Sequence, residues 1–124
     1  MQQAFDTALH IEAWIVDKLQ PGMICEELYA GALAMVESAG LAGHFMGTSG
    51  AQAKFVGHGV GLELDELPLL APRFKQSLVQ GNVIAVEPKF SYPGMGVVGI
   101  ENTYAMTAEG CEKITDLANG IVSL

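Results

Sequence analysis

The sequence GHGVGLELDE, residues 57–66, places one histidine among three glycines and then alternates apolar with acidic side chains. Such alternation is typical of a β-strand with one buried face. Glycines within a strand allow the backbone to approach a ligand or an ion closely. Residues 56–64 are therefore predicted to form a strand on which His58 is a candidate ligand. A histidine beside glycines can also have a purely structural role.

Further strands are predicted towards the C-terminus. Turns that contain glycine precede three segments rich in apolar and β-branched side chains. Residues 67–72 contain two prolines and are expected to form an extended loop rather than a strand. The three predicted strands are residues 83–87, 97–107 and 111–115.

Two helices are predicted before the strands. In residues 4–19 and 25–39, apolar side chains recur at the spacing of a helix with one buried face. Gln20, Pro21 and Gly22 end the first of them. Residues 41–54 are rich in Gly, Ala and Ser and are expected to form a loop. The fold class predicted is α+β, with two helices followed by a set of antiparallel strands.

Two carboxylates interrupt the apolar strands. Glu87 ends the segment VIAVE, and Glu101 follows the apolar run VVGI. An uncompensated buried carboxylate is costly, so each needs a cation, a proton or solvent. One imidazole, from His58, and two carboxylates form a ligand set suited to Mn, Co, Fe or Zn. The alternative is that both carboxylates lie on strand faces exposed to water.

The composition argues against several classes of partner. The chain has 124 residues, of which 14 are acidic and 6 basic, and its formal net charge is −8. Nucleic acid is therefore not an expected partner, because phosphate contacts depend on Lys and Arg. No run reaches the ~18–20 apolar residues of a membrane span. Cys25 and Cys111 are far apart, which argues against a disulfide scaffold and favours a reducing cytoplasm.

The chain is hydrophobic for its size. Half of its residues are hydrophobic and the mean hydropathy is +0.32. Large exposed apolar surfaces mark interaction sites. We therefore expect further polypeptide or a second copy of the chain to cover part of this surface, and a homodimer or another form of self-association is expected.

Three motifs together resemble the C-terminal signatures of the creatinase, aminopeptidase P, prolidase and methionine aminopeptidase family. They are residues 57–66, Val86-Glu87-Pro88 and Ile100-Glu101-Asn102-Thr103, and they occur in the family's order at plausible spacing. The resemblance covers nearly the whole chain. It implies the C-terminal portion of the pita-bread fold, an α+β fold whose metal site lies inside a curved antiparallel sheet.

The resemblance also implies roles for the candidate ligands. His58 and Glu87 would be terminal ligands of one divalent ion, and Glu101 would bridge two ions. The family's two aspartates, which hold the second ion, come from strands before the first helix. Residues 1–124 are therefore expected to form a partial catalytic domain without them. Asp6 and Asp17 do not replace them, because eleven helical residues separate them by roughly 16 Å, whereas paired ions lie about 3.5–4 Å apart.

Asp65 stands where the family usually has a histidine that contacts substrate and assists proton transfer. An ionised carboxylate cannot donate a hydrogen bond. Asp65 is therefore a candidate catalytic residue whose chemistry differs from the family's, and it would suit a cationic substrate group or a metal ion.

The implied parent protein is a metal-dependent exopeptidase that hydrolyses short peptides, Xaa-Pro peptides among them, with water activated by two ions. With three of five expected ligands, this chain alone is expected to bind at most one divalent ion weakly and to be inactive. Two alternatives stay open. One is a non-catalytic module that binds peptides or proteins, and the other is a creatinase-like hydrolase of a small C–N bond.

Overall fold

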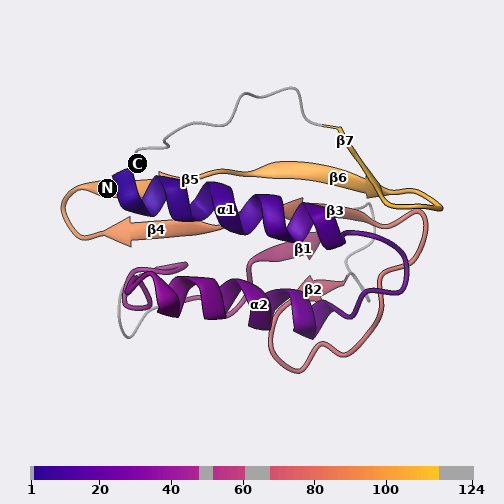
Figure 1. Ribbon diagram of the computed structural model, residues 1–124, viewed down its shortest axis with the longest axis horizontal. Helices are drawn as coiled ribbons and strands as arrows, with labels where there is room; N and C mark the ends of the chain where they lie inside the picture. Colours follow the sequence, from indigo (N-terminus) through magenta and orange to yellow (C-terminus); the bar gives the residue numbers. More distant parts are fainter. Residues whose placement is uncertain (1, 48–51, 61–67, 115–124) are drawn as a thin grey trace.

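The computed structural model describes residues 2–47, 52–60 and 68–114 of the chain. Two helices lie side by side along a set of antiparallel strands (Figure 1). The elements are α1 (Gln2–Lys18), α2 (Cys25–Ser38), β1 (Gly57–Gly59), β2 (Leu69–Leu70), β3 (Val83–Val86), β4 (Lys89–Tyr92), β5 (Gly96–Gly99), β6 (Asn102–Met106) and β7 (Cys111–Lys113).

Both predicted helices are confirmed to within two residues at each end. Gly22 has φ +99°, a backbone conformation that residues with a side chain rarely adopt. Its N–H donates to the carbonyl oxygen of Leu78 at 2.7 Å, which ties the connection between the helices to the segment before β3. The turn predicted at Gln20, Pro21 and Gly22 therefore also fixes the helices against the strands.

The strands form a five-stranded sheet and a separate hairpin. The order in the sheet is β2-β1-β3-β6-β7, and β4 pairs with β5. Every pairing between these strands is antiparallel. The predicted α+β fold class, two helices followed by antiparallel strands, is confirmed.

The prediction for residues 97–107 was wrong, because this segment forms two strands, β5 and β6, rather than one. Ile100 and Glu101 interrupt the extended segment between β5 and β6. Glu87 and Pro88 interrupt it in the same way between β3 and β4. Pro88 has no N–H to donate to a ladder, but its carbonyl oxygen accepts the N–H of Ile100 at 3.3 Å. These two strand interruptions therefore lie against each other, where the five-stranded sheet ends and the β4–β5 hairpin begins.

Two smaller differences follow from tertiary pairing. Leu69 and Leu70, expected in a loop, form the short edge strand β2 and pair with β1. Residues 89–92, which follow the expected strand 83–87, form β4 and pair with β5. Short segments of this kind become strands because a neighbour supplies their hydrogen bonds, and a local sequence pattern does not reveal that neighbour.

The five-stranded sheet has two different faces. Residues paired directly across antiparallel strands share a face, and His58, Ala85 and Thr103 form one such row across β1, β3 and β6. The opposite face carries Ile84, Val86 and Tyr104, all buried. Asn102 on that second face contacts Glu12 of α1. The helices therefore cover the second face, and His58 lies on the other.

In the described part of the chain, no helix combines the length and the hydrophobicity needed to cross a bilayer. Cys25 and Cys111 are both free thiols.

The close packing of the two strand interruptions against each other yields a prediction about stability. A Cβ added at Gly99 would collide with the carbonyl oxygen of Pro88 and would lie 2.9 Å from Cα of Lys89. Because both obstacles are backbone atoms, Gly99→Ala should lower the free energy of unfolding by about 1–3 kcal/mol. Urea denaturation followed by circular dichroism measures this change.

Gly110→Ala is the matched control. Nothing lies within 4 Å of a Cβ built at Gly110, so this variant should change stability by no more than about 0.5 kcal/mol. Equal losses of stability in Gly99→Ala and Gly110→Ala would contradict the tight contact between Gly99 and the backbone of Pro88 and Lys89.

Candidate metal centre

The three predicted ligands come from neighbouring positions on one sheet face. His58 pairs with Ala85, which in turn pairs with Thr103. Glu87 follows Ala85 by two residues, and Glu101 precedes Thr103 by two, so the register places the two glutamates opposite each other where the ladder ends. The N–H of Glu87 donates to the carbonyl oxygen of Val56 at 2.9 Å. The candidate centre therefore lies at the junction of the sheet and the hairpin.

His58 and Glu87 are in contact. The distance from Nε2 of His58 to Oε2 of Glu87 is 3.4 Å. On the other side of the ring, Nδ1 of His58 lies 3.0 Å from the carbonyl oxygen of Gly59. A carbonyl oxygen only accepts, so Nδ1 carries a proton, and Nε2 is the ring nitrogen that faces the Glu87 carboxylate.

This pair can be bridged in two ways. If the imidazole is neutral, its Nε2 lone pair and the carboxylate need a proton or a metal ion between them, whereas a protonated imidazole donates from Nε2 to Glu87 directly. Two tetrahedral ligands at about 2.0–2.2 Å from a zinc ion would lie about 3.4 Å apart. The His58–Glu87 pair therefore has both the donor chemistry and the spacing of two metal ligands.

Glu87 is buried, with 9% of its surface exposed. Burial raises the pKa of its carboxyl group above the usual value. Lys89 opposes this rise, Glu101 adds to it, and His58 opposes it. In the absence of a metal ion, the charged form of Glu87 is therefore held in an unfavourable environment.

Glu101 differs from Glu87 in its surroundings. Its side chain is 51% exposed, and Oε1 lies 3.5 Å from Nζ of Lys89. Within residues 2–47, 52–60 and 68–114, no group of three His, Cys, Asp or Glu side chains is arranged so as to hold a metal ion. The structure thus brings His58 and Glu87 together, and it pairs Glu101 with a lysine instead.

Lys89 is the residue at this site that sequence reasoning missed. The available signal was its position two residues after Glu87, since side chains two apart in an extended chain point to the same side. The other predicted site residue, Asp65, lies outside the described residues.

The fold, together with the His58–Glu87 pair, shows an α+β domain with a candidate metal centre between two antiparallel sheets. The chain belongs to metallopeptidase family M24, whose profile matches residues 1–108. It is 30% identical over 114 residues to the Xaa-Pro dipeptidase of Pyrococcus furiosus, an alignment that covers 92% of this chain and 31% of that protein.

Solved structures share the fold. The prolidase from Pyrococcus horikoshii OT3 matches with a TM-score of 0.82 at 27% identity, over 98% of this chain and 33% of that one. Zn-substituted E. coli aminopeptidase P in complex with product matches with a TM-score of 0.71 at 17% identity, over 93% and 31%. The expected pita-bread fold is confirmed, and the chain spans about a third of the length of the proteins it matches.

The burial of Glu87 yields a prediction for metal-free protein in EDTA. Because the folded-state pKa of Glu87 is raised, the stability that this group contributes is present at low pH. It falls as the pH rises from the usual carboxyl pKa through the raised one. Glu87→Gln removes the buried charge, so it should raise the free energy of unfolding at pH 7, and the gain should shrink at acidic pH. Urea denaturation over a pH series measures it.

Glu101→Gln is the control, because Glu101 is half exposed and its ion pair with Lys89 is screened by water. It should change stability by no more than about 0.5 kcal/mol at either pH. A loss of stability in Glu87→Gln at pH 7 would mean that the charged carboxylate is well compensated in the native protein.

Proposed function

We propose that this chain supplies part of the catalytic centre of a metal-dependent exopeptidase that acts on short peptides, with Xaa-Pro dipeptides as the first class to test. The observation that carries the proposal is the His58–Glu87 pair, with Nε2 and Oε2 3.4 Å apart on the sheet face away from the helices. Membership of metallopeptidase family M24 supports it. So does the similarity to a protein named Xaa-Pro dipeptidase.

The residues of this chain would divide the work. The N–H of His58 Nδ1, bonded to Gly59, holds the imidazole so that Nε2 is a ligand. Glu87 offers a carboxylate that burial has already removed from most water, and Glu101 would join them by leaving Lys89. A divalent ion bound there would lower the pKa of a water molecule and polarise the scissile carbonyl.

The proposed donor set of one imidazole and two carboxylates suits Mn, Co, Fe or Zn. A full centre would hold two ions, with two aspartate ligands besides these three residues. We assign three of those five ligands, His58, Glu87 and Glu101, to residues 1–124. That count underlies the two predictions that follow.

The first prediction concerns binding by the chain alone. Titration calorimetry with Mn²⁺ or Co²⁺ should show at most one equivalent bound, weakly, because a three-ligand site leaves the ion open to water. His58→Ala should abolish the binding. His10→Ala is the control: His10 is exposed on α1, and its loss should leave the titration unchanged. Tight uptake of two equivalents would contradict the ligand count.

The second prediction concerns turnover. The chain alone should release no more amino acid from Xaa-Pro or N-terminal Met peptides than an EDTA-treated sample, because the proposed nucleophile needs both ions. Quantifying the released amino acid by chromatography tests this. Turnover that is abolished both by EDTA and by Glu101→Ala would show that three ligands suffice.

A further inference from the structure

A buried carboxylate on α1 lies outside the candidate metal centre. Glu12 is 6% exposed, and of the described residues it and Glu87 are the two buried ones whose side chains carry charge. It lies on the same helix face as Ala8, Ile11 and Ile15, which are fully buried. A hydrophobic side chain would be the ordinary choice there, since a buried charge is costly unless it is paired or hydrogen-bonded.

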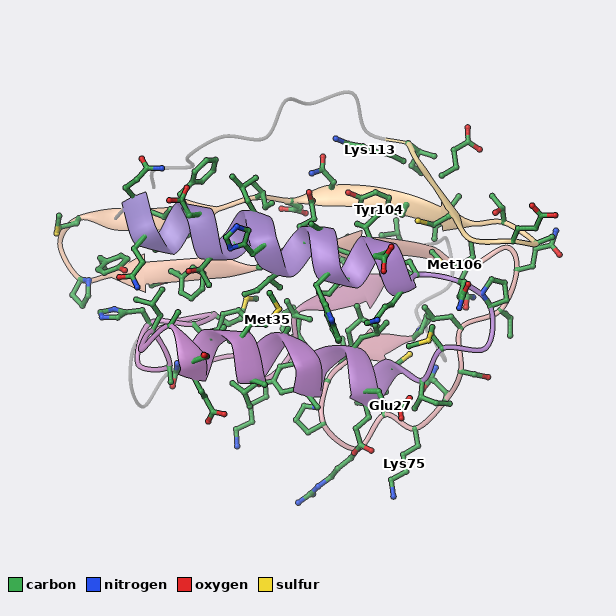
Figure 2. The ribbon with its side chains drawn as sticks, viewed as in Figure 1. Glu27, Met35, Lys75, Tyr104, Met106 and Lys113 are labelled. Atoms are coloured by element: carbon green, nitrogen blue, oxygen red, sulfur yellow. The ribbon has the colours of Figure 1, made fainter. Side chains whose placement is uncertain are left out.

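Two groups on β6 bind this carboxylate. Nδ2 of Asn102 donates to Oε2 of Glu12 at 2.6 Å, and both side chains are buried. The Tyr104 hydroxyl also donates to the Glu12 carboxylate. Burial raises the pKa of Tyr104 most, and the charge of Glu12 and this hydrogen bond raise it further. Tyr104 lies in the middle of β6 (Figure 2). Glu12 therefore binds the first and third residues of one strand, and the first of them, Asn102, is ninety residues away in sequence.

The first of those residues adjoins the metal centre. Asn102 begins β6 and directly follows Glu101. Glu101 itself lies beyond the last pair of the β3–β6 ladder, Val86 with Asn102, and its side chain is 51% exposed. Its side chain contacts Lys89. Its backbone lies between Ile100, which is buried and whose N–H donates to the carbonyl oxygen of Pro88 at 3.3 Å, and Asn102, so the position of that backbone depends in part on how Asn102 is held.

We propose that Glu12 is a positioning residue for Glu101. Its carboxylate holds Asn102 against α1 and thereby keeps the Glu101 backbone opposite Glu87 at the end of the ladder. The inference rests on the proposed function in so far as Glu101 is a metal ligand. It assigns to the helix side of the sheet a part in building a site on the opposite side.

The test compares variants of the full chain in EDTA by ¹⁵N relaxation of the Glu101 amide. Glu12→Leu removes the acceptor, and the order parameter at Glu101 should fall from about 0.85 to below about 0.6. Glu12→Gln keeps a carbonyl oxygen that accepts from Asn102 and should retain the higher value. Tyr104→Phe removes the hydroxyl farther along β6 and should also retain it.

Thr7→Val is the matched control on the same helix. Thr7 is buried, and its Oγ1 donates to the carbonyl oxygen of Gln3 at 2.8 Å, so the variant loses one hydrogen bond without touching β6. It should leave the order parameter at Glu101 unchanged. A merely structural role for Glu12 would lower stability in Glu12→Leu while Glu101 stayed ordered, and that result would overturn the proposal.

Folding and metal binding are controlled separately. If Glu12→Leu does not fold, the all-apolar combination of Glu12→Leu, Asn102→Leu and Tyr104→Phe replaces it, because it removes the acceptor together with the two donors that bind it. Glu101 should still lose order in that variant, and a rigid Glu101 would refute the proposal. In titrations with Mn²⁺, Glu12→Leu should bind about tenfold more weakly than the wild type. If the wild type binds no Mn²⁺, the metal-site proposal fails, whereas the relaxation data still decide the role of Glu12.

Discussion

The pairing of β3 with β6 is the constraint on which the rest of the site depends. Its register sets Ala85 opposite Thr103 and Val86 opposite Asn102. Both strands then break at the same level, and the chain continues as the β4–β5 hairpin. Since side chains alternate between faces, a shift of one residue would move Glu87 to the side covered by the helices. The register therefore decides whether a metal centre can exist on the other side.

The groups of the candidate metal centre are not in their most stable environment in the metal-free fold. Burial makes the charged form of Glu87 unfavourable, and Glu101 is held by Lys89. A divalent ion would compensate the buried charge of Glu87, and it would compete with Lys89 for the carboxylate of Glu101. Such local costs are common at functional sites, where a ligand must be held ready rather than at its most stable. On the far side of the sheet, Glu12 is equally buried but meets two donors.

Much of the fold and part of the site could be predicted from local pattern. Helical spacing located α1 and α2 to within two residues, and the segment VIAVE located β3. The sequence grouped His58, Glu87 and Glu101 as candidate metal ligands, and the first two of these are in contact. The split between β5 and β6 was not foreseen, because an apolar run does not show where a strand passes from one sheet to another. Lys89 was missed because its partner, Glu101, is twelve residues away.

The sequence by itself determined the fold class, the family motifs and the residue types of the candidate ligands, since spacing and composition are local properties. The tertiary structure decided which of these groups meet. The β1–β3 pairing places His58 against Glu87. Glu101 forms an ion pair with Lys89, and Asn102 binds Glu12, from which it is separated by ninety residues in sequence. The physical reason is that hydrogen bonds and ion pairs act over a few ångströms, whatever the separation along the chain. Only the packed sheets and helices bring such residues within that distance.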